Sequence, residues 1–441
     1  MSRTIRIFSI DDPTLFKQKM FVWAQQFETA IWLDSNNYEQ QYSSFNCALA
    51  MEEFTSIKTD FQGAFEQLKE YQSYTKDYIF GYISYDVKND IEKLTSSNFD
   101  GLNFPDLYFF QPQKLIFIKE DKVEFHYLQM IDDELEEDFE DIIETNPNLT
   151  SNGKGAFSQE NDIKIKLRIH KDEYHQKVEK VLEHIHRGDI YEANFCQEFY
   201  AENTVINPYE VYVHLNKISE PPFATFFRND SHYLLSATPE RYIRKEDSKI
   251  ISQPIKGTAK RLIDPIEDEK IAFDLARDEK ERSENIMIVD LVRNDLSKTA
   301  KRGSVQVEEL CKVYPFKQVH QMISTVVSEI KNTTHPVDVI KDTFPMGSMT
   351  GAPKISAMKI IETLEETKRG LYSGTVGYFT PEGDFDFNVV IRSILYNAEN
   401  KYVSYSVGGA ITSKSTPEKE YEECLLKAKA MKYVLTHTNK S

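Results

Sequence analysis

The stretch Ile163-Lys164-Ile165-Lys166-Leu167-Arg168-Ile169 alternates apolar and basic side chains, and a second apolar pattern follows it as far as Gly188. The period of two predicts a β-strand over residues 163–169. The second pattern has helical spacing, and a glycine after such a run commonly ends a helix. Its apolar members are Tyr174, Val178, Val181, Leu182 and Ile185. A strand is therefore predicted to lead directly into a helix.

Similar patterns recur along the rest of the chain. Strand-like runs occupy residues 232–235, 375–379, 389–396 and 402–407. Longer helical runs occupy residues 265–297, 353–366 and 417–436. Strands that alternate with long helices predict an α+β or mixed α/β fold built in layers.

A change of composition near residue 160 predicts a boundary between two parts of the chain. Residues 1–140 mix aromatic strand-like runs with polar helical stretches and carry no catalytic signature. From residue 132 to residue 162 the chain becomes acidic and then rich in Asn, Ser and Gly, which is typical of a surface loop or linker. We therefore expect an N-terminal scaffold or regulatory region over residues 1–160 and a catalytic domain over residues 161–441.

The overall charge argues against two classes of partner. The chain has 441 residues, a formal net charge of -18 and a sequence pI near 5.1. A nucleic acid or an anionic membrane surface would be repelled on average. A small anionic substrate would need a local cation, either a metal ion or a focused group of Arg and Lys side chains. The first ten residues lack a basic segment followed by an apolar run, so a cytoplasmic location is expected.

The cysteines do not indicate a metal site or a nucleophile. Cys47, Cys196, Cys311 and Cys424 are widely separated and show no zinc-binding spacing. None lies in the glycine-flanked turn that glutamine-hydrolysing domains use. If the chain consumes ammonia, a separate subunit must supply it.

The first candidate for chemistry is Lys256, in Pro254-Ile255-Lys256-Gly257-Thr258. It follows a strand-like run and precedes a glycine, which would let a ligand approach the backbone closely. Taken alone, the pattern is a weak signal and favours a strand that ends in a turn with a solvated lysine.

Carboxylates on two predicted helices form the second candidate. Glu284 lies where a charged helical stretch becomes apolar, and Glu420 and Glu423 share one face of another helix. Glutamates from different helices that meet a substrate carboxylate would suit Mg²⁺, which prefers oxygen ligands. The alternative is a pair of solvated carboxylates favoured by the helix dipole.

The third candidate is the run Phe344-Pro345-Met346-Gly347-Ser348-Met349-Thr350-Gly351-Ala352-Pro353-Lys354, which leads into a predicted helix. Backbone N–H groups and the Thr350 hydroxyl at a helix N-terminus would bind an anion. An ordinary tight loop with a helix cap is the alternative. Arg392, on an apolar predicted strand, either faces solvent or clamps a carboxylate with both nitrogens.

In this order, the motifs resemble those of the chorismate-binding enzyme family, which includes anthranilate, aminodeoxychorismate, isochorismate and salicylate synthases. The resemblance covers about residues 165–435 and implies a large layered fold with β-sheets flanked by helices, as in anthranilate synthase component I. It rests on residues 188–194, 254–258, 283–295, 344–354 and 374–378, together with Arg392, Gly408 and Glu423.

Lys256 assigns the chain to a branch of this family. Members that resemble anthranilate synthase component I carry alanine at this position, and those that resemble aminodeoxychorismate synthase component I carry lysine. The resemblance therefore implies amination of chorismate at C4, in the pathway to 4-aminobenzoate and folate, with anthranilate synthesis as the alternative. The water-using synthases carry a lysine base where this chain has Glu192, which argues against hydration. Other branch members often carry Gln there.

The resemblance also implies roles for individual residues. Lys256 would attack the ring at C2, and Glu240 would protonate the C4 hydroxyl as it leaves. His320 matches a histidine near that leaving group. A nucleophilic lysine must be neutral, so we expect burial beside Mg²⁺ or another cation to lower the pKa of Lys256.

The remaining implied contacts bind the metal ion and the substrate. Glu284 and Glu423 match ligands of Mg²⁺, and Glu420 matches a further carboxylate in or beside the metal's coordination shell. Ammonia would come from a separate glutamine amidotransferase subunit. Ala410 stands where the family commonly has glycine. The substrate contacts implied are Gly257, Thr258, Thr350, Tyr378, Arg392, Gly408 and Gly409.

Overall fold

The computed structural model describes residues 2–38, 40–92, 94–147 and 163–437. Its α-helices are α1 Pro13–Trp23, α2 Ala64–Thr75, α3 Lys88–Glu92, α4 Leu135–Glu144, α5 Lys171–Arg187, α6 Pro208–Ser219, α7 Pro265–Arg277, α8 Glu279–Ser297, α9 Pro336–Thr343, α10 Lys354–Leu364 and α11 Pro417–His437. Short 3₁₀ helices are η1 Ala24–Gln26, η2 Tyr85–Val87, η3 Gln129–Glu134 and η4 Gly347–Met349.

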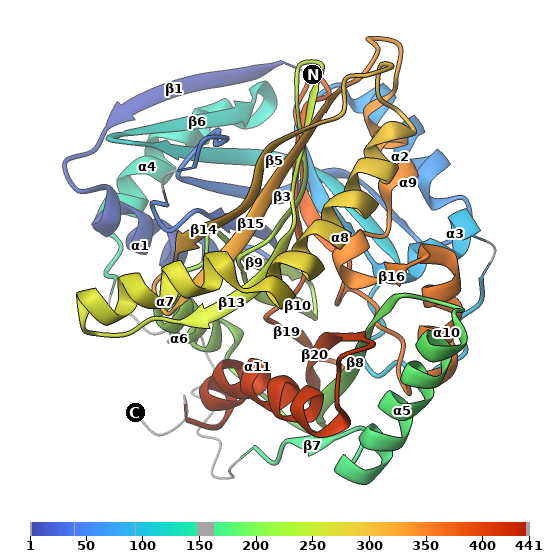
Figure 1. Cartoon of the computed structure of the whole chain (residues 1–441). Helices are drawn as coiled ribbons and strands as arrows, with labels where there is room; N and C mark the ends of the chain where they lie inside the picture. The colour runs from blue at the N-terminus through green and yellow to red at the C-terminus, as the bar shows by residue number, and fades with distance from the viewer. Residues whose placement is uncertain (1, 39, 93, 148–162, 438–441) are drawn as a thin grey trace.

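The strands are β1 Arg3–Ser9, β2 Thr29–Asp34, β3 Cys47–Thr59, β4 Ile79–Ile83, β5 Leu107–Lys119, β6 Lys122–Leu128, β7 Lys166–Leu167, β8 Glu192–Ala201, β9 Phe223–Asn229, β10 His232–Thr238, β11 Arg241–Glu246, β12 Lys249–Gln253, β13 Ile255–Lys260, β14 Gln306–Pro315, β15 Val319–Glu329, β16 Gly351–Ala352, β17 Thr375–Phe379, β18 Phe385–Val389, β19 Ser393–Asn397 and β20 Tyr402–Thr412. Helices pack around these strands (Figure 1), which confirms the layered mixed α/β fold.

The strands form one continuous antiparallel network. From β8 the hydrogen-bonded order runs through β20, β19, β10, β9, β2, β3 and β5. It continues from β5 through β4, β17, β18, β11 and β12 to β15. An irregularity in the β3–β5 register lies between Glu53 and Thr55. Such irregularities bend a strand. This one lies in β3 and β5, the two long strands that connect the first run of strands to the second.

Two large apolar clusters stabilise this arrangement. One includes residues of α1, α5, α6 and α11 with the strands they cover. The other is rich in phenylalanine and lies among β4, β5, β17, β18 and α8. Residues of β8 are buried almost without interruption, so this strand is covered on both faces. The ends of β8, β13 and β20 lie close to α8 and α11 (Figure 1), and this is the region that carries most of the predicted site residues.

Three predicted elements differ from the observed ones. The strand predicted over residues 163–169 is limited to β7, Lys166–Leu167. The helix predicted over residues 265–297 is two helices, because the extended Asp278 ends α7 and its side chain caps α8 by accepting from Glu281 N–H. The strand predicted over residues 389–396 is broken between β18 and β19, where Arg392 has a positive φ.

The acidic stretch predicted as a loop or linker is helical in its first part, since η3 and α4 occupy residues 129–144. Its Asn-, Ser- and Gly-rich part lies at residues 148–162, outside the described residues. Strands from both sides of residue 160 pair with each other, as β4 does with β17 and β2 with β9. The division into residues 1–160 and 161–441 stays a prediction.

Among the described residues, no helix is both long and apolar enough to cross a membrane.

Candidate active site

Lys256 is the second residue of β13 and is held in place from its backbone. The side-chain amide of Asn285 on α8 donates hydrogen bonds to the carbonyl oxygens of Lys256 and Met322, at 3.2 Å in both cases. Asn285 is buried, so β13 and β15 are fastened to the middle of α8. Gly257 has a φ of 95°, a conformation that a side chain would strain. The strand therefore deviates just after Lys256.

The Lys256 ammonium lies beside Glu192, the first residue of β8. Lys256 Nζ donates to Glu192 Oε1 at 3.2 Å, and the exposed fractions of the two side chains are 14% and 1%. Burial by itself would lower the pKa of Lys256, but the nearby carboxylates of Glu192, Glu284 and Glu240 outweigh it and raise the pKa. The lowering of this pKa beside Mg²⁺ or another cation stays a prediction, because without a bound cation the surrounding carboxylates set the direction of the shift.

Glu240 lies between β10 and β11 and has the electrostatics of a general acid. It is 5% exposed, and its carboxylate accepts hydrogen bonds from the Ser348 hydroxyl and from Ile255 N–H. Burial raises the pKa of Glu240 to about 7, and these hydrogen bonds together with Lys256 oppose that effect. A carboxyl group with this pKa is partly protonated at neutral pH.

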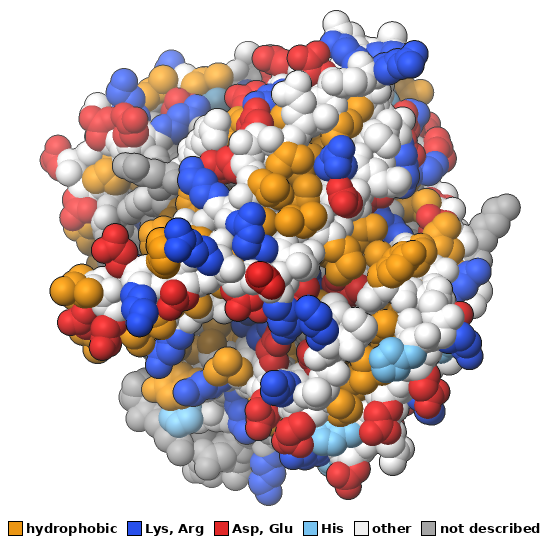
Figure 2. Space-filling view, in the orientation of Figure 1, with side chains coloured by type: hydrophobic (Ala, Val, Ile, Leu, Met, Phe, Trp, Pro, Cys, Tyr) orange, Lys and Arg blue, Asp and Glu red, His pale blue; other side chains and the backbone are white. Residues whose placement is uncertain are grey.

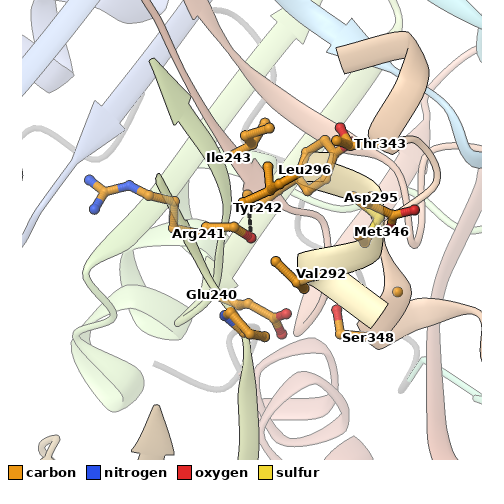
Figure 3. Close-up of a pocket in the computed structure, with 13 residues that line it drawn as sticks. Glu240, Arg241, Tyr242, Ile243, Val292, Asp295, Leu296, Thr343, Met346 and Ser348 are labelled. Carbon is orange, nitrogen blue, oxygen red and sulfur yellow. Dashed lines mark hydrogen bonds between the residues drawn. The ribbon is translucent and has the colours of Figure 1, made fainter. Parts of the chain in front are cut away.

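The cavity behind Glu240 explains why burial dominates. Figure 3 shows the carboxylate pointing toward Ser348, with Val292 of α8 nearby. The lining also includes apolar side chains, among them Tyr242, Ile243, Leu296 and Met346, and the polar side chains of Arg241, Ser252, Asp295 and Thr343. The apolar part of the wall disfavours the ionised carboxylate.

The carboxylates predicted to bind a metal ion come together from α8 and α11. A Cβ atom built on Gly409 of β20 would lie 3.2 Å from Glu420 Oε2 and 3.7 Å from Glu423 Oε1, so both side chains extend over this glycine. Lys427 pairs with Glu423 at 2.6 Å and also donates to the Gly408 carbonyl oxygen at 2.9 Å. In Figure 2, acidic and basic side chains gather around a hollow between α7 and α11.

The pKa values of these carboxylates indicate crowding. Burial raises the pKa of Glu284 and of Glu420, and Glu423 contributes to both shifts through its charge. Burial also acts on Glu423, but Lys427 outweighs it and lowers the pKa of that group. Glu281, one turn before Glu284 on α8, has a pKa raised by burial and by the Glu284 charge. The site concentrates negative charge that a cation would relieve.

This donor set fits Mg²⁺, which is bound in proteins by one or two carboxylates together with water and substrate oxygens. Within the described part of the chain, no three His, Cys, Asp or Glu side chains are grouped closely enough to form a complete metal cage. The carboxylates best placed to contribute are Glu284 and Glu423, with Glu420 beside them. Their lysine partners, Lys280 at 3.7 Å and Lys427, balance part of their charge.

The glycine-rich run predicted to bind an anion is anchored to β8 by Arg369. This buried guanidinium donates to the carbonyl oxygens of Met349 at 2.6 Å and Asn194 at 2.7 Å, and it pairs with Glu365 through two nitrogens. Thr350 is fully buried, and its hydroxyl donates within the loop to the Met346 carbonyl oxygen at 3.2 Å. Its hydroxyl is therefore occupied, in contrast to the prediction that it faces an anion.

Arg392 lies in the break between β18 and β19 with a φ of 53°. A left-handed conformation costs a residue with a side chain of the order of 1–2 kcal/mol, so the surroundings must stabilise it. Its one long contact is from Nη1 to the Lys427 carbonyl oxygen at 3.5 Å. Burial lowers the pKa of Arg392, and the charges of Tyr372 and Glu423 oppose this. The guanidinium therefore belongs to the same charged region as α11.

Two predicted contacts lie elsewhere. Tyr378 stacks on Phe80 and lines a separate cavity with Asp34 and Ser35, because its position in β17 directs it there. His320 lies 2.9 Å from Asp268 of α7, measured from Nε2 to Oδ1. Side chains alternate between the two sides of β15, and the His320 side chain lies on the side that faces α7.

The structure also indicates residues that the sequence did not single out. Tyr372 is buried and close enough to Arg392 to affect its pKa, which makes it a better substrate-contact candidate than Tyr378. Gln321 lies opposite Thr258 in the β13–β15 register, and its buried Oε1 has no hydrogen-bond partner among the described atoms. Thr258 itself is exposed. Glu281 was detectable only as a further acidic residue one turn from Glu284.

Comparisons with known proteins agree with this arrangement. Residues 28–433 match the family model described as chorismate binding enzyme. Aminodeoxychorismate synthase component 1 of Escherichia coli (strain K12) is 39% identical over 271 residues, which cover 60% of this chain and 59% of that protein. The match thus spans less than two thirds of that relative. Anthranilate synthase component 1 of Aquifex aeolicus (strain VF5) is 33% identical over 363 residues, covering 80% of this chain and 73% of the relative.

A solved structure supports the fold over almost the whole chain. The crystal structure of anthranilate synthase component I from Streptococcus pneumoniae TIGR4 superposes with a TM-score of 0.77 at 25% identity. The superposition covers 90% of this chain and 94% of that one.

Proposed function

Because the chain belongs to the chorismate binding enzyme family, we propose that it aminates chorismate at C4 to give 4-amino-4-deoxychorismate. The names of its relatives support both this reaction and the synthesis of anthranilate. The observation that favours amination at C4 is Lys256, a buried amine placed between a carboxyl group of raised pKa and a cluster of carboxylates.

Glu240 would act first as the general acid. Its pKa of about 7 keeps a proton available at neutral pH, and the Ser348 hydroxyl and Ile255 N–H stabilise the carboxylate left after transfer. The proton would pass to the C4 hydroxyl of chorismate, which leaves as water. The apolar wall of the cavity behind Glu240 keeps bulk water from this side.

Lys256 would act as a temporary nucleophile. Its neutral amine would form a bond to C2 while the ring double bonds shift and the C4–O bond breaks. Ammonia would then add at C4 and pass one proton to the Glu240 carboxylate, the double bonds would shift back, and the C2–N bond would break to release the lysine amine. Asn285, which fixes the Lys256 carbonyl oxygen, would hold the amine at a constant position during both steps.

The substrate carries two carboxylates, and the site offers a means to bind each. Arg392 would hold the enolpyruvyl carboxylate, because a guanidinium matches a carboxylate with two hydrogen bonds. Glu284 and Glu423, with Glu420 beside them, would hold Mg²⁺, which would supply positive charge for binding the ring carboxylate. The bound ion would neutralise the repulsion between the anionic substrate and the acidic site.

We further propose that ammonia comes from a separate glutamine amidotransferase subunit and that the reaction takes place in the cytoplasm. The first point follows from the cysteines, since all four are buried and none is placed as a nucleophile in the site. The purified chain should use ammonium salts at raised pH but not glutamine. If the chain alone used glutamine, the proposal of a separate amidotransferase subunit would be disproved.

The proposed function is tested by incubating the purified chain with chorismate, Mg²⁺ and ammonium, followed by chromatographic analysis. Aminodeoxychorismate, which gives 4-aminobenzoate only after a lyase is added, is expected. Anthranilate, which is fluorescent and appears directly, would instead support the alternative.

A further inference from the structure

Glu192 is a buried carboxylate whose hydrogen bonding is incomplete. Its side chain is 1% exposed, and Oε1 accepts a single hydrogen bond, from Lys256 Nζ at 3.2 Å. Its second oxygen, Oε2, is buried with no hydrogen-bond partner among the described atoms. Buried carboxylates usually accept several hydrogen bonds, because an ionised group without them is costly. One carboxylate oxygen of Glu192 is therefore buried and left free to accept or hold a proton.

The Glu192–Lys256 pair can exist in two forms that differ by the position of one proton. In water the ammonium and carboxylate form is favoured, since the two reference pKa values differ by about 6 units. The carboxylates around Lys256 raise its pKa, so the amine needs an acceptor in direct contact to lose its proton, and Glu192 is buried against it with Oε2 unpartnered among the described atoms. Because Nζ and Oε1 are already hydrogen-bonded, the proton needs no solvent to move between them.

We propose that Glu192 is the base that takes the proton of the Lys256 ammonium before the amine attacks the substrate. This inference rests on the proposed function. The N–H bond of the ammonium breaks as the O–H bond on Glu192 forms, which leaves a neutral amine and a neutral carboxylic acid. After ammonia has added at C4 and the C2–N bond has broken, Glu192 returns the proton to the released amine. No further reactant is needed.

The charged groups around the pair come from three directions. Glu284 acts on it from α8, Glu240 from between β10 and β11, and Glu423 from α11, while Lys280 pairs with Glu284. Glu240 is needed in its protonated form to release the hydroxyl, so it cannot accept the lysine proton in the same step. Glu192 is the group in direct contact with Nζ, which makes it the acceptor.

The side chain of Glu192 is not required to form its strand. Its backbone lies between Thr412 of β20 and Ala352 of β16, in antiparallel register with both. The Glu192→Gln variant keeps the shape of the side chain and the oxygen that contacts Lys256, so it should fold. Glu202→Gln is a matched control, since Glu202 pairs with Lys166 at the surface.

The experiment measures the amination rate from pH 6.5 to pH 9.5, with the concentration of free NH₃ held constant by adjusting total ammonium. General base catalysis is worth roughly 10²–10⁴-fold, so Glu192→Gln should be slower by about 100-fold or more at neutral pH. The ratio of the Glu192→Gln rate to the wild-type rate should rise about tenfold per pH unit, because Lys256 must lose its proton to solvent in the variant while the ionisation of Glu240 affects both proteins alike. The ratio of the Glu202→Gln rate to the wild-type rate should not change with pH.

A second variant separates a chemical role from a structural one. Glu192→Ala leaves space beside Lys256, and added formate should restore activity in a saturable manner by supplying the missing carboxylate. Equal rates and equal pH profiles for Glu192→Gln and the wild type, or no rescue by formate, would overturn the inference. If the wild type itself forms no aminated product, the proposed function fails instead.

Discussion

The raised pKa of Glu240 predicts that this residue destabilises the protein as the pH rises. A group with a higher pKa in the folded than in the unfolded state stabilises the fold below its unfolded pKa and loses that contribution through its folded pKa. For Glu240 the relevant window runs from the usual value of 4.5 to about 7. Glu240→Gln removes the ionisation and keeps the shape of the side chain.

The magnitude follows from the two pKa values. One pKa unit corresponds to about 1.4 kcal/mol, and integrating the proton binding of this single group between pH 5 and pH 8 gives about 2–3 kcal/mol. The free energy of unfolding of Glu240→Gln, relative to the wild type, should therefore increase by about that amount across the window. Above pH 8 the difference should be constant, because Glu240 is then ionised in both states.

The assay is chemical unfolding of both proteins at closely spaced pH values, followed by tryptophan fluorescence and circular dichroism. Glu382→Gln, at an exposed position between β17 and β18, serves as the control and should parallel the wild type. A difference between Glu240→Gln and the wild type that does not change with pH would refute the assignment of a proton to Glu240 near neutrality.

Changes to the other site residues should affect separate steps. Lys256→Ala should abolish amination at C4 or redirect the product toward anthranilate, as seen by chromatography, and an unchanged rate would remove the lysine from the mechanism. Arg392→Lys should raise KM for chorismate about 10–100-fold with a smaller change in kcat, since a two-nitrogen contact is lost; equal KM values would place the carboxylate elsewhere. Glu284→Gln and Glu423→Gln should each raise the Mg²⁺ concentration for half-maximal activity at least about tenfold, and should weaken Mg²⁺ binding measured by calorimetry, because each removes an anionic oxygen ligand. Unaltered Mg²⁺ binding in both would exclude them as ligands.

Much of the fold could be predicted from local patterns in the sequence. The strand at Thr375–Phe379 and the helices over 353–366 and 417–436 appear at or close to the predicted positions, because each has a clear apolar period. The breaks were not predictable in this way. Asp278 interrupts a continuous helical pattern by capping α8, and Arg392 adopts a positive φ that no arginine favours by itself.

In the site, contacts within one helix could be predicted from the sequence, and contacts between residues far apart in the chain could not. Glu420 and Glu423 are on one helix, so their common face followed from spacing alone. The Lys256–Glu192 contact joins residues that are 64 positions apart, and it depends on how β8 and β13 meet. Tyr378 was predicted as a substrate contact, but only the structure shows that it stacks on Phe80 and that Tyr372 is the tyrosine near Arg392. Without a bound cation the pKa of Lys256 is raised, because its neighbours are carboxylates that the sequence did not place beside it.

The proposed amination depends on a covalent bond between the Lys256 amine and C2 of the substrate. The most direct measurement is mass spectrometry of the protein after rapid quenching with chorismate and Mg²⁺ in the absence of ammonia, followed by peptide mapping. The account predicts an adduct with the mass of chorismate minus one water, located on Lys256 and lost when ammonia is added before quenching. An unmodified Lys256 in a preparation that still aminates chorismate would contradict it.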